Sequence, residues 1–231
     1  MEEPLIEKVR VLKAQALGFR EENPEEALRV LGIAESDLRA ALLELSAKRA
    51  TEPPGDYEKR IASQLVHVLG SMGGVCRRHH DDKRSIDFYD DGYQIEKEYH
   101  LADSYALVQR LVARVLDDPG ILEAQESLIN GSSMNAALHD AEAVVQQQID
   151  DRLRDRDEYA SADLAVVRLL LGEGDWADRL KKLKDQGSSY AVNVTHDTLK
   201  EVLAAVKRSP RIYPQLRKDL EAALRMLPKR K

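Results

Sequence analysis

The sequence predicts an all-α protein of about ten helices arranged in antiparallel pairs. Three observations support this fold class. Apolar residues recur at helical spacing along most of the 231-residue chain. Aromatic residues make up 5% and charged residues 33% of the composition, a balance that suits helices packed on helices better than a sheet. The only β-like run, residues 190–194, is short.

Residues 1–50 are predicted to form a degenerate helical pair that caps the N-terminal end of the fold. Apolar residues at helical spacing between Leu5 and Phe19 indicate the first helix. Asn23 then caps a second helix, and Pro24 suits its first position. Residues 51–56, TEPPGD, form the clearest linker, because two prolines and a glycine do not continue a helix.

Residues 57–117 are predicted to hold the core helical repeats, with helices near 57–79 and 83–99 and a third that begins at 101–103. In the first two, small residues let the helices approach closely and larger residues fill the seam between them. The seam residues are Leu69, Met72, Gly73 and Cys76 in the first helix and Ser85, Tyr89 and Gly92 in the second. Such a hairpin cannot bury its apolar face alone, so neighbouring helices must stack on it.

Residues 118–231 are predicted to form divergent helical repeats and a C-terminal cap. We expect a short helix at 121–129, a long polar helix at 134–154, an apolar helix ending near 171 and a turn at 172–177. Residues 187–194 are predicted to be a loop, followed by a helix from 195 or 197 to 206 and a last helix at 216–227. The basic run 228–231 is predicted to be a solvated tail.

The overall composition limits the classes of partner and the compartment that we expect for this protein. A net charge of -6 favours solubility and argues against a nucleic-acid-binding protein. One cysteine excludes an internal disulfide framework, which fits a reducing compartment. The first residues lack the pattern of a signal peptide, and no stretch approaches about 20 uninterrupted apolar residues. We therefore expect a cytoplasmic protein with no membrane partner.

The sequence predicts no catalytic residue, no cofactor and no metal site. His79 to Asp82 offer ligand types, but adjacent residues do not face one another on a helix, so the run is interpreted as a solvated helix end. Cys76 is interpreted as a small buried hydrophobic residue. The glycine-rich run 70–74 lacks the lysine of a phosphate loop, and close helix contact explains it better. Trp176 is interpreted as an anchor that fills space between helices.

The seam residues and the runs GSMGGVCRR, SIDFYDDGYQIE and DSYALVQRLV carry a more specific signal. Their spacing resembles the tetratricopeptide repeat of about 34 residues. The sequence of these runs is similar to the TRAFs-binding or sensor-type repeat module of bacterial signalling proteins and of stress-kinase regulatory regions. The resemblance covers residues 62–116 and, more weakly, 163–177. Cys76 stands where the repeat prefers an aromatic residue, and His80 stands where it prefers glycine.

The resemblance implies a right-handed α-solenoid in which the first helix of each pair lines a concave groove. His67, Arg77 and Arg78 would then project toward that groove, and Arg110 and Arg114 of the next first helix would fall on the same side. Guanidinium groups there would suit a carboxylate, a phosphate or an acidic peptide. The alternative is that these arginines pair with the acidic residues between 81 and 103.

Three functional hypotheses follow. The first is a non-catalytic scaffold or adaptor that binds a protein or peptide partner, in bacterial signalling or conflict systems as the resemblance implies. The second is a sensor that holds a small anionic, nucleotide-like ligand in the arginine-bearing groove. The third is a homo-oligomer formed through an apolar stripe on the helix that begins at 134, although this stripe could equally pack back on its own chain. The stripe comprises Ala137, Val144, Val145 and Ile149.

Overall fold

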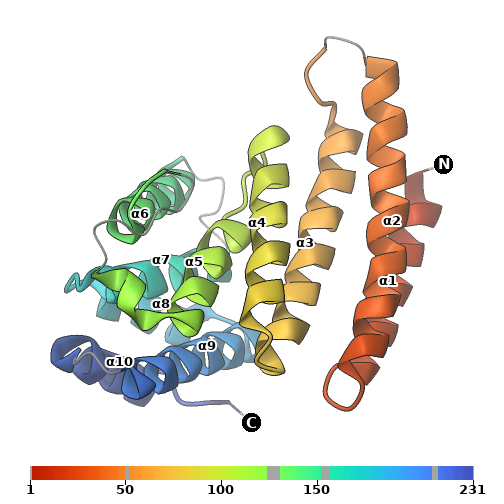
Figure 1. The fold of residues 1–231 in the computed structure, drawn as a ribbon. Coiled ribbons are helices and arrows are strands. Elements are labelled where there is room, and N and C mark those ends of the chain that lie inside the picture. The colour runs from red at the N-terminus through yellow and green to blue at the C-terminus, as the bar shows by residue number, and fades with distance from the viewer. Residues whose placement is uncertain (1, 50–51, 124–130, 152–156, 210–212, 231) are drawn as a thin grey trace. The chain divides into compact units, whose positions relative to one another are not determined.

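A computed structural model of the chain describes residues 2–49, 52–123, 131–151, 157–209 and 213–230 (Figure 1). These residues form ten α-helices and one 3-10 helix and contain no β-strand, so the prediction of an all-α protein is confirmed. The chain divides into two compact units, Met1–Arg110 and Leu111–Lys231, and the division falls inside a helix.

Within the described ranges, no helix combines the length and the apolar character needed to cross a membrane.

The first unit consists of successive antiparallel helices. Helix α1 (Glu2–Phe19) pairs with α2 (Pro24–Arg49), and α3 (Asp56–Arg78) pairs with α4 (Asp82–Glu98). Helix α2 also packs on α3, and α1 contacts α3, so the two pairs are stacked (Figure 1). The side chain of Asn23 accepts a hydrogen bond from the backbone N–H of Glu26 at 3.2 Å, which is the predicted cap of α2.

Helices α3 and α4 each begin and end one residue before the predicted positions. Asp81 caps α4 by accepting a hydrogen bond from the N–H of Arg84 at 3.3 Å. Both helices end in a left-handed residue, His80 with φ 59° and His100 with φ 51°. The N–H of Asp81 then donates to the carbonyl of Cys76 at 3.0 Å, which closes the last turn of α3. Glycine favours this geometry, so His80 occupies a position suited to glycine.

The core of the first unit lies along the facing sides of α1 to α4. Its largest fully buried apolar residues include Leu31, Leu38, Ile61, Leu65 and Leu69, each with at most 2% of its surface exposed. Burying these side chains is the main source of stability for stacked helices, because apolar surface leaves water.

The second unit contains the remainder of α5 (Tyr105–Asp117), the 3-10 helix η1 (Pro119–Leu122), α6 (Met134–Asp150) and four further helices. These four are α7 (Glu158–Leu171), α8 (Trp176–Gln186), α9 (Ser189–Arg208) and α10 (Pro214–Met226). Helix α7 is central, because it contacts α6, α8, α9 and α10. Helix α8 contacts α9, and α10 packs on both of them.

The connection between α7 and α8 is the predicted inter-helix turn. Gly172, with φ 78°, ends α7 in the left-handed conformation, and the N–H of Glu173 donates to the carbonyl of Arg168 at 2.9 Å. Trp176 begins α8 with only 9% of its surface exposed, as expected for an anchor between helices.

The predicted loop at 187–194 is wrong, because α9 already begins at Ser189. The hydroxyl of Ser188 accepts a hydrogen bond from the N–H of Ala191 at 3.1 Å and caps the helix. The apparently β-like run 190–194 is therefore helical, with Ala191 and Val192 buried. Of its two valines, Val192 is buried and Val194 is half-buried.

Two other predicted elements are shorter than expected or only partly described. The predicted helix at 121–129 overlaps η1 by two residues, and its remainder from 124 lies outside the described residues. The long polar helix ends at Asp150, and residues 152–154 of its predicted range lie outside the described residues.

The prediction that 228–231 is a solvated tail is wrong for Arg230, whose backbone and side chain are both hydrogen-bonded to the second unit.

Candidate functional site

All the predicted seam residues of α3 and α4 are buried. Gly73 faces the ring of Tyr89 so closely that a Cβ added to it would lie 2.8 Å from Cζ of the ring. The hydroxyl of Ser85 donates to the carbonyl of Gly73 at 3.0 Å. A Cβ on Gly92 would lie 3.1 Å from Cβ of Ala106, so α5 also approaches closely. The seam residues Leu69, Met72, Cys76, Ser85 and Tyr89 expose 5% of their surface or less.

The glycine-rich run 70–74 lies inside α3 and accommodates two tyrosine rings. Tyr89 sits over Gly73, and a Cβ on Gly70 would overlap the ring of Tyr105. The two rings meet edge to face, with centroids 6.2 Å apart and an interplanar angle of 74°. Close helix contact therefore accounts for Gly70 and Gly73, whereas a Cβ on Gly74 would make only ordinary contacts, the nearest at 3.7 Å.

Arg110 is held inside the first unit. Only 5% of its surface is exposed, and its guanidinium carbon lies 3.8 Å from the centroid of the Tyr93 ring. Its Nη1 atom lies 3.9 Å from a carboxylate oxygen of Asp90 on α4. A guanidinium that contacts an aromatic face and an acid of its own chain has little surface left for a ligand.

The other predicted groove residues differ in their surroundings. Arg77 is half-buried and donates from Nη1 to Oε1 of Gln109 at 2.7 Å, which joins α3 to α5. Arg78 is exposed and lies 3.8 Å from the carboxylate of Glu21. His67 is half-buried on α3. Arg114 is half-buried and belongs to the second unit, whereas the other four residues belong to the first.

Helix α5 is positioned by a buried acid. The carboxylate of Glu96, with 5% of its surface exposed, accepts hydrogen bonds from the N–H groups of Ala106 at 2.9 Å and Leu107 at 3.2 Å. The first backbone N–H groups of a helix have no partner within the helix, and a negative charge there is favourable. Glu96 of α4 thus fixes the start of α5, which carries Gln109 and Arg110.

Cys76 is not placed for nucleophilic chemistry. Only 2% of its surface is exposed, and this burial raises the pKa of its thiol to about 11. A thiol with such a pKa stays neutral at pH 7, and it is the thiolate that reacts.

His79 is exposed, and its Nε2 atom lies 2.7 Å from the carbonyl oxygen of Arg20.

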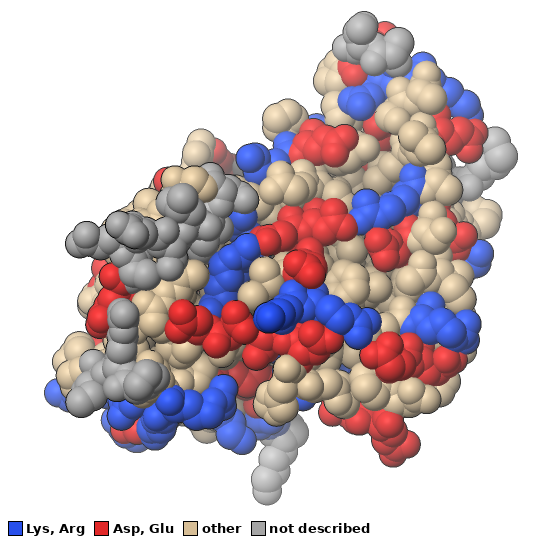
Figure 2. All heavy atoms as spheres, viewed as in Figure 1, with Lys and Arg blue, Asp and Glu red and all other residues tan. Residues whose placement is uncertain are grey.

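The outer surface mixes charge with isolated apolar residues. Figure 2 shows basic and acidic side chains interspersed over the visible face. On the first unit, Leu43 of α2 is 73% exposed, Leu17 and Val11 of α1 are 56% and 55% exposed, and Ile33 of α2 is 39% exposed. The residues of the predicted apolar stripe on α6 differ in burial. Ala137 and Val145 are buried, whereas Val144 is 42% exposed.

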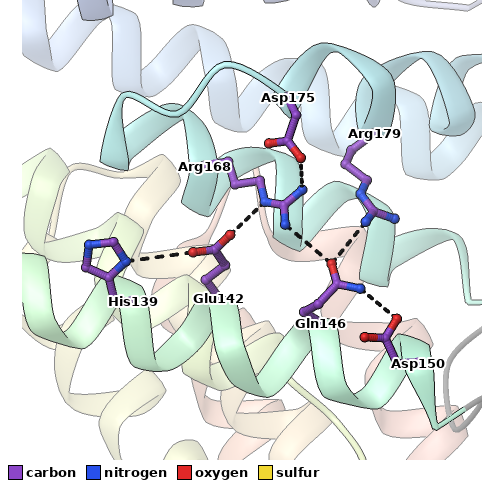
Figure 3. A network of polar contacts seen from close by, with 7 residues as sticks. All are labelled: His139, Glu142, Gln146, Asp150, Arg168, Asp175 and Arg179. Atoms are coloured by element: carbon purple, nitrogen blue, oxygen red, sulfur yellow. Dashed lines mark hydrogen bonds and ion pairs between the residues drawn. The ribbon is translucent and has the colours of Figure 1, made fainter.

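The second unit contains a polar network that the sequence did not indicate (Figure 3). Arg168 of α7 donates from Nε to Oε1 of Glu142 at 2.8 Å and also pairs with Asp175 just before α8. Oε1 of Gln146 accepts from Nη2 of Arg179 at 3.0 Å, and 3.4 Å separates it from Nη2 of Arg168. The network therefore ties α6 to α7 and α8.

The α6 members of this network follow a pattern that the sequence does contain. His139, Glu142, Gln146 and Asp150 are spaced by three or four residues and so share one face of α6 (Figure 3). A polar stripe opposite a buried apolar face is typical of a solvated helix side, so the sequence alone does not show that these residues meet α7 and α8.

His139, Glu142 and Glu173 are the described residues that could hold a metal ion. Their potential ligand atoms lie within 4.8 Å of one another. Glu142 already accepts a hydrogen bond from Arg168, and the His139 side chain is 53% exposed. A cation would have to compete with the guanidinium for Glu142, so this cluster is better suited to the polar network.

No family model, curated protein or solved structure matches this chain. The resemblance to tetratricopeptide repeats therefore depends on the residues described above.

Proposed function

We propose that this chain is a non-catalytic helical-repeat scaffold that binds a protein partner. The observation that carries the proposal is the stacking of helical hairpins within each unit. In the first unit the α1–α2 pair stacks on the α3–α4 pair, and α1 contacts α3. In the second unit the α7–α8 pair stacks on α9–α10, with α7 against α9 and α8 against α10. Contact of first helix with first helix is the neighbour pattern of a tetratricopeptide-like solenoid.

A stacked scaffold suits binding for a thermodynamic reason. Its helices are ordered before the partner arrives, so less conformational entropy is lost on association. Leu17 of α1 and Leu43 of α2 are exposed apolar side chains that a partner could cover, each as a separate contact point on the first unit. Signalling in the bacterial cytoplasm is the setting that the tetratricopeptide resemblance suggests for such a scaffold.

We rank the anion-sensing alternative second. It needs several guanidinium groups to face a common ligand, whereas Arg110 lies against Tyr93 and Asp90, and Arg77 donates to Gln109. Self-association through α6 ranks third, because two residues of its apolar stripe, Ala137 and Val145, are buried within the second unit.

The proposal is tested by capturing a partner on the immobilised chain from the cell of origin and then measuring the affinity of the purified pair. We expect the double substitution Leu17→Glu and Leu43→Glu to weaken binding at least tenfold without lowering the melting temperature. Gln15→Glu, at an exposed position of α1, is the matched control and should leave the affinity unchanged. Recovery of only the chain itself would overturn the scaffold function in favour of self-association.

A further inference from the structure

The segment that follows α10, residues 227–230, contacts α9 through the backbone of Arg230. The N–H of Arg230 donates to Oδ1 of Asn193 at 2.8 Å. The side-chain amide of Asn193 donates in return to the carbonyl of Arg230 at 3.1 Å. One asparagine thus satisfies both backbone groups of a single residue, a contact that does not depend on the identity of that residue.

The side chain of Arg230 makes a second set of contacts at the end of α8. Its Nη1 atom donates to the carbonyl of Gly187 at 2.7 Å, and its Nη2 atom donates to the carbonyl of Lys184. The last carbonyls of a helix have no partner within the helix and form the negative end of its dipole. This end of α8 therefore selects a cationic group, and the planar fork of arginine fits two carbonyls at once.

Neighbouring groups extend the preference for basic residues. Nζ of Lys229 lies 2.8 Å from the carboxylate of Asp197, one helical turn after Asn193 on α9. A shallow cleft, partly open to solvent, lies at the same end of α8, and its lining mixes Asp157 and Glu158 with Lys182. The preference for a basic residue beside the arginine therefore rests on Asp197.

We propose that α9 and the C-terminal end of α8 form a binding site for an extended basic peptide segment that contains an arginine, and that residues 228–230 are its internal occupant. Asn193 hydrogen-bonds the peptide backbone, and the carbonyls of Lys184 and Gly187 accept hydrogen bonds from the arginine side chain. Asp197 forms an ion pair with the preceding lysine. This inference rests on the proposed scaffold function, because it names the chemistry of the partner.

Residues 228–230 compete with any partner segment, because they are covalently joined to the site that they occupy. A segment joined to its own site acts at an effective concentration of the order of millimolar. A partner segment must bind more strongly than this tethered segment, which it does through contacts beyond those that residues 228–230 make. Exchange of one occupant for the other leaves no polar group of Asn193 or of the α8 end unsatisfied.

The test uses the full chain and a fluorescent peptide with the sequence of residues 226–231. We expect the peptide to bind the Arg230→Ala chain at least tenfold more tightly than the wild-type chain, because the internal occupant has lost its arginine contacts. Adding Asn193→Ala to that variant should weaken binding at least tenfold. Asn135→Ala, at an exposed position of α6, is the matched control and should have no effect.

Hydrogen exchange provides a readout in the wild-type chain. The amide of Arg230 donates to Asn193, so excess peptide should accelerate its exchange by displacing the internal segment. Absence of peptide binding to the Arg230→Ala chain, or binding that is insensitive to Asn193→Ala, would overturn the inference. A captured partner that binds the Asn193→Ala chain normally would overturn this site alone, whereas peptide binding without any captured partner would overturn only the scaffold function.

Discussion

The aromatic ring of Tyr89 lies against the backbone of Gly73, so that a Cβ at position 73 would approach three ring atoms to 3.0 Å or less. We predict that Gly73→Ala lowers the free energy of unfolding by about 1–3 kcal/mol, the usual cost of overpacking a well-filled core. Urea unfolding followed by circular dichroism measures this loss. The ring is fully buried and has no room to retreat.

Gly32 of α2 is the matched control for this substitution. It also lies within a helix, but no atom lies within 4 Å of the place that its Cβ would occupy. Gly32→Ala should therefore raise the free energy of unfolding by about 0.5–1 kcal/mol, since alanine loses less backbone entropy than glycine in a helix. Equal effects of the two substitutions would contradict the close contact at the seam.

Glu96 is predicted to stabilise the start of α5. Glu96→Ala removes a buried acceptor from the N–H groups of Ala106 and Leu107 and should cost about 2 kcal/mol in the free energy of unfolding. Hydrogen exchange of those two amides should become faster at the same time. Glu98→Ala, at an exposed position near the end of α4, is the control and should change stability by less than about 0.5 kcal/mol.

Replacing His80 with glycine is predicted to stabilise the protein. Its φ of 59° is costly for a residue with a side chain, and His80→Gly should raise the free energy of unfolding by about 0.5–1 kcal/mol. Thermal unfolding measures the gain. Gln94→Gly, at an exposed position inside α4, should instead lower stability by about 1 kcal/mol. A loss at both positions would show that the imidazole of His80 contributes more than the backbone strain costs.

Cys76 is predicted to make stability depend on pH above 9. Burial raises the pKa of its thiol from 9.0 to about 11, so between these values the unfolded chain releases a proton that the folded chain retains. The stabilisation is present in full below pH 9 and is lost as the pH rises through 11, by about 2.7 kcal/mol at most. Cys76→Ala should therefore show a shallower decline in stability over this interval than the wild-type chain.

Thiol labelling gives an independent check, because Cys76 is the only cysteine in the chain. At pH 8 a thiol reagent should react with the folded protein much more slowly than with the urea-unfolded protein, since the buried group is neutral. Rapid labelling of the folded chain would contradict the burial.

The hairpin of α3 and α4 was predictable because its signals are local. The prolines and glycine before α3 and the alternation of small and large residues, from Leu69 to Gly92, lie within a short stretch of sequence. The start of α9 was missed for a local reason too: the run 190–194 has a β-like composition, and the capping role of Ser188 is visible only as a single serine.

The contacts of the second unit could not be predicted in the same way. Arg168 meets Glu142 across 26 positions of sequence, and Arg230 meets Asn193 across 37. No periodicity links such partners, because tertiary stacking alone brings them together. Likewise, the sequence indicated that Arg77 and Arg110 lie on consecutive first helices, but it could not show that Tyr93 stacks on the guanidinium of Arg110.

The passage of α5 from one compact unit into the other determines how the chain can be shortened for experiment. A fragment that stopped at Arg110 or started at Leu111 would sever a continuous helix in its middle. The last turns of α5 would then be separated from its first turn, which Glu96 holds by hydrogen bonds. Expression fragments should therefore keep residues 105–117 whole.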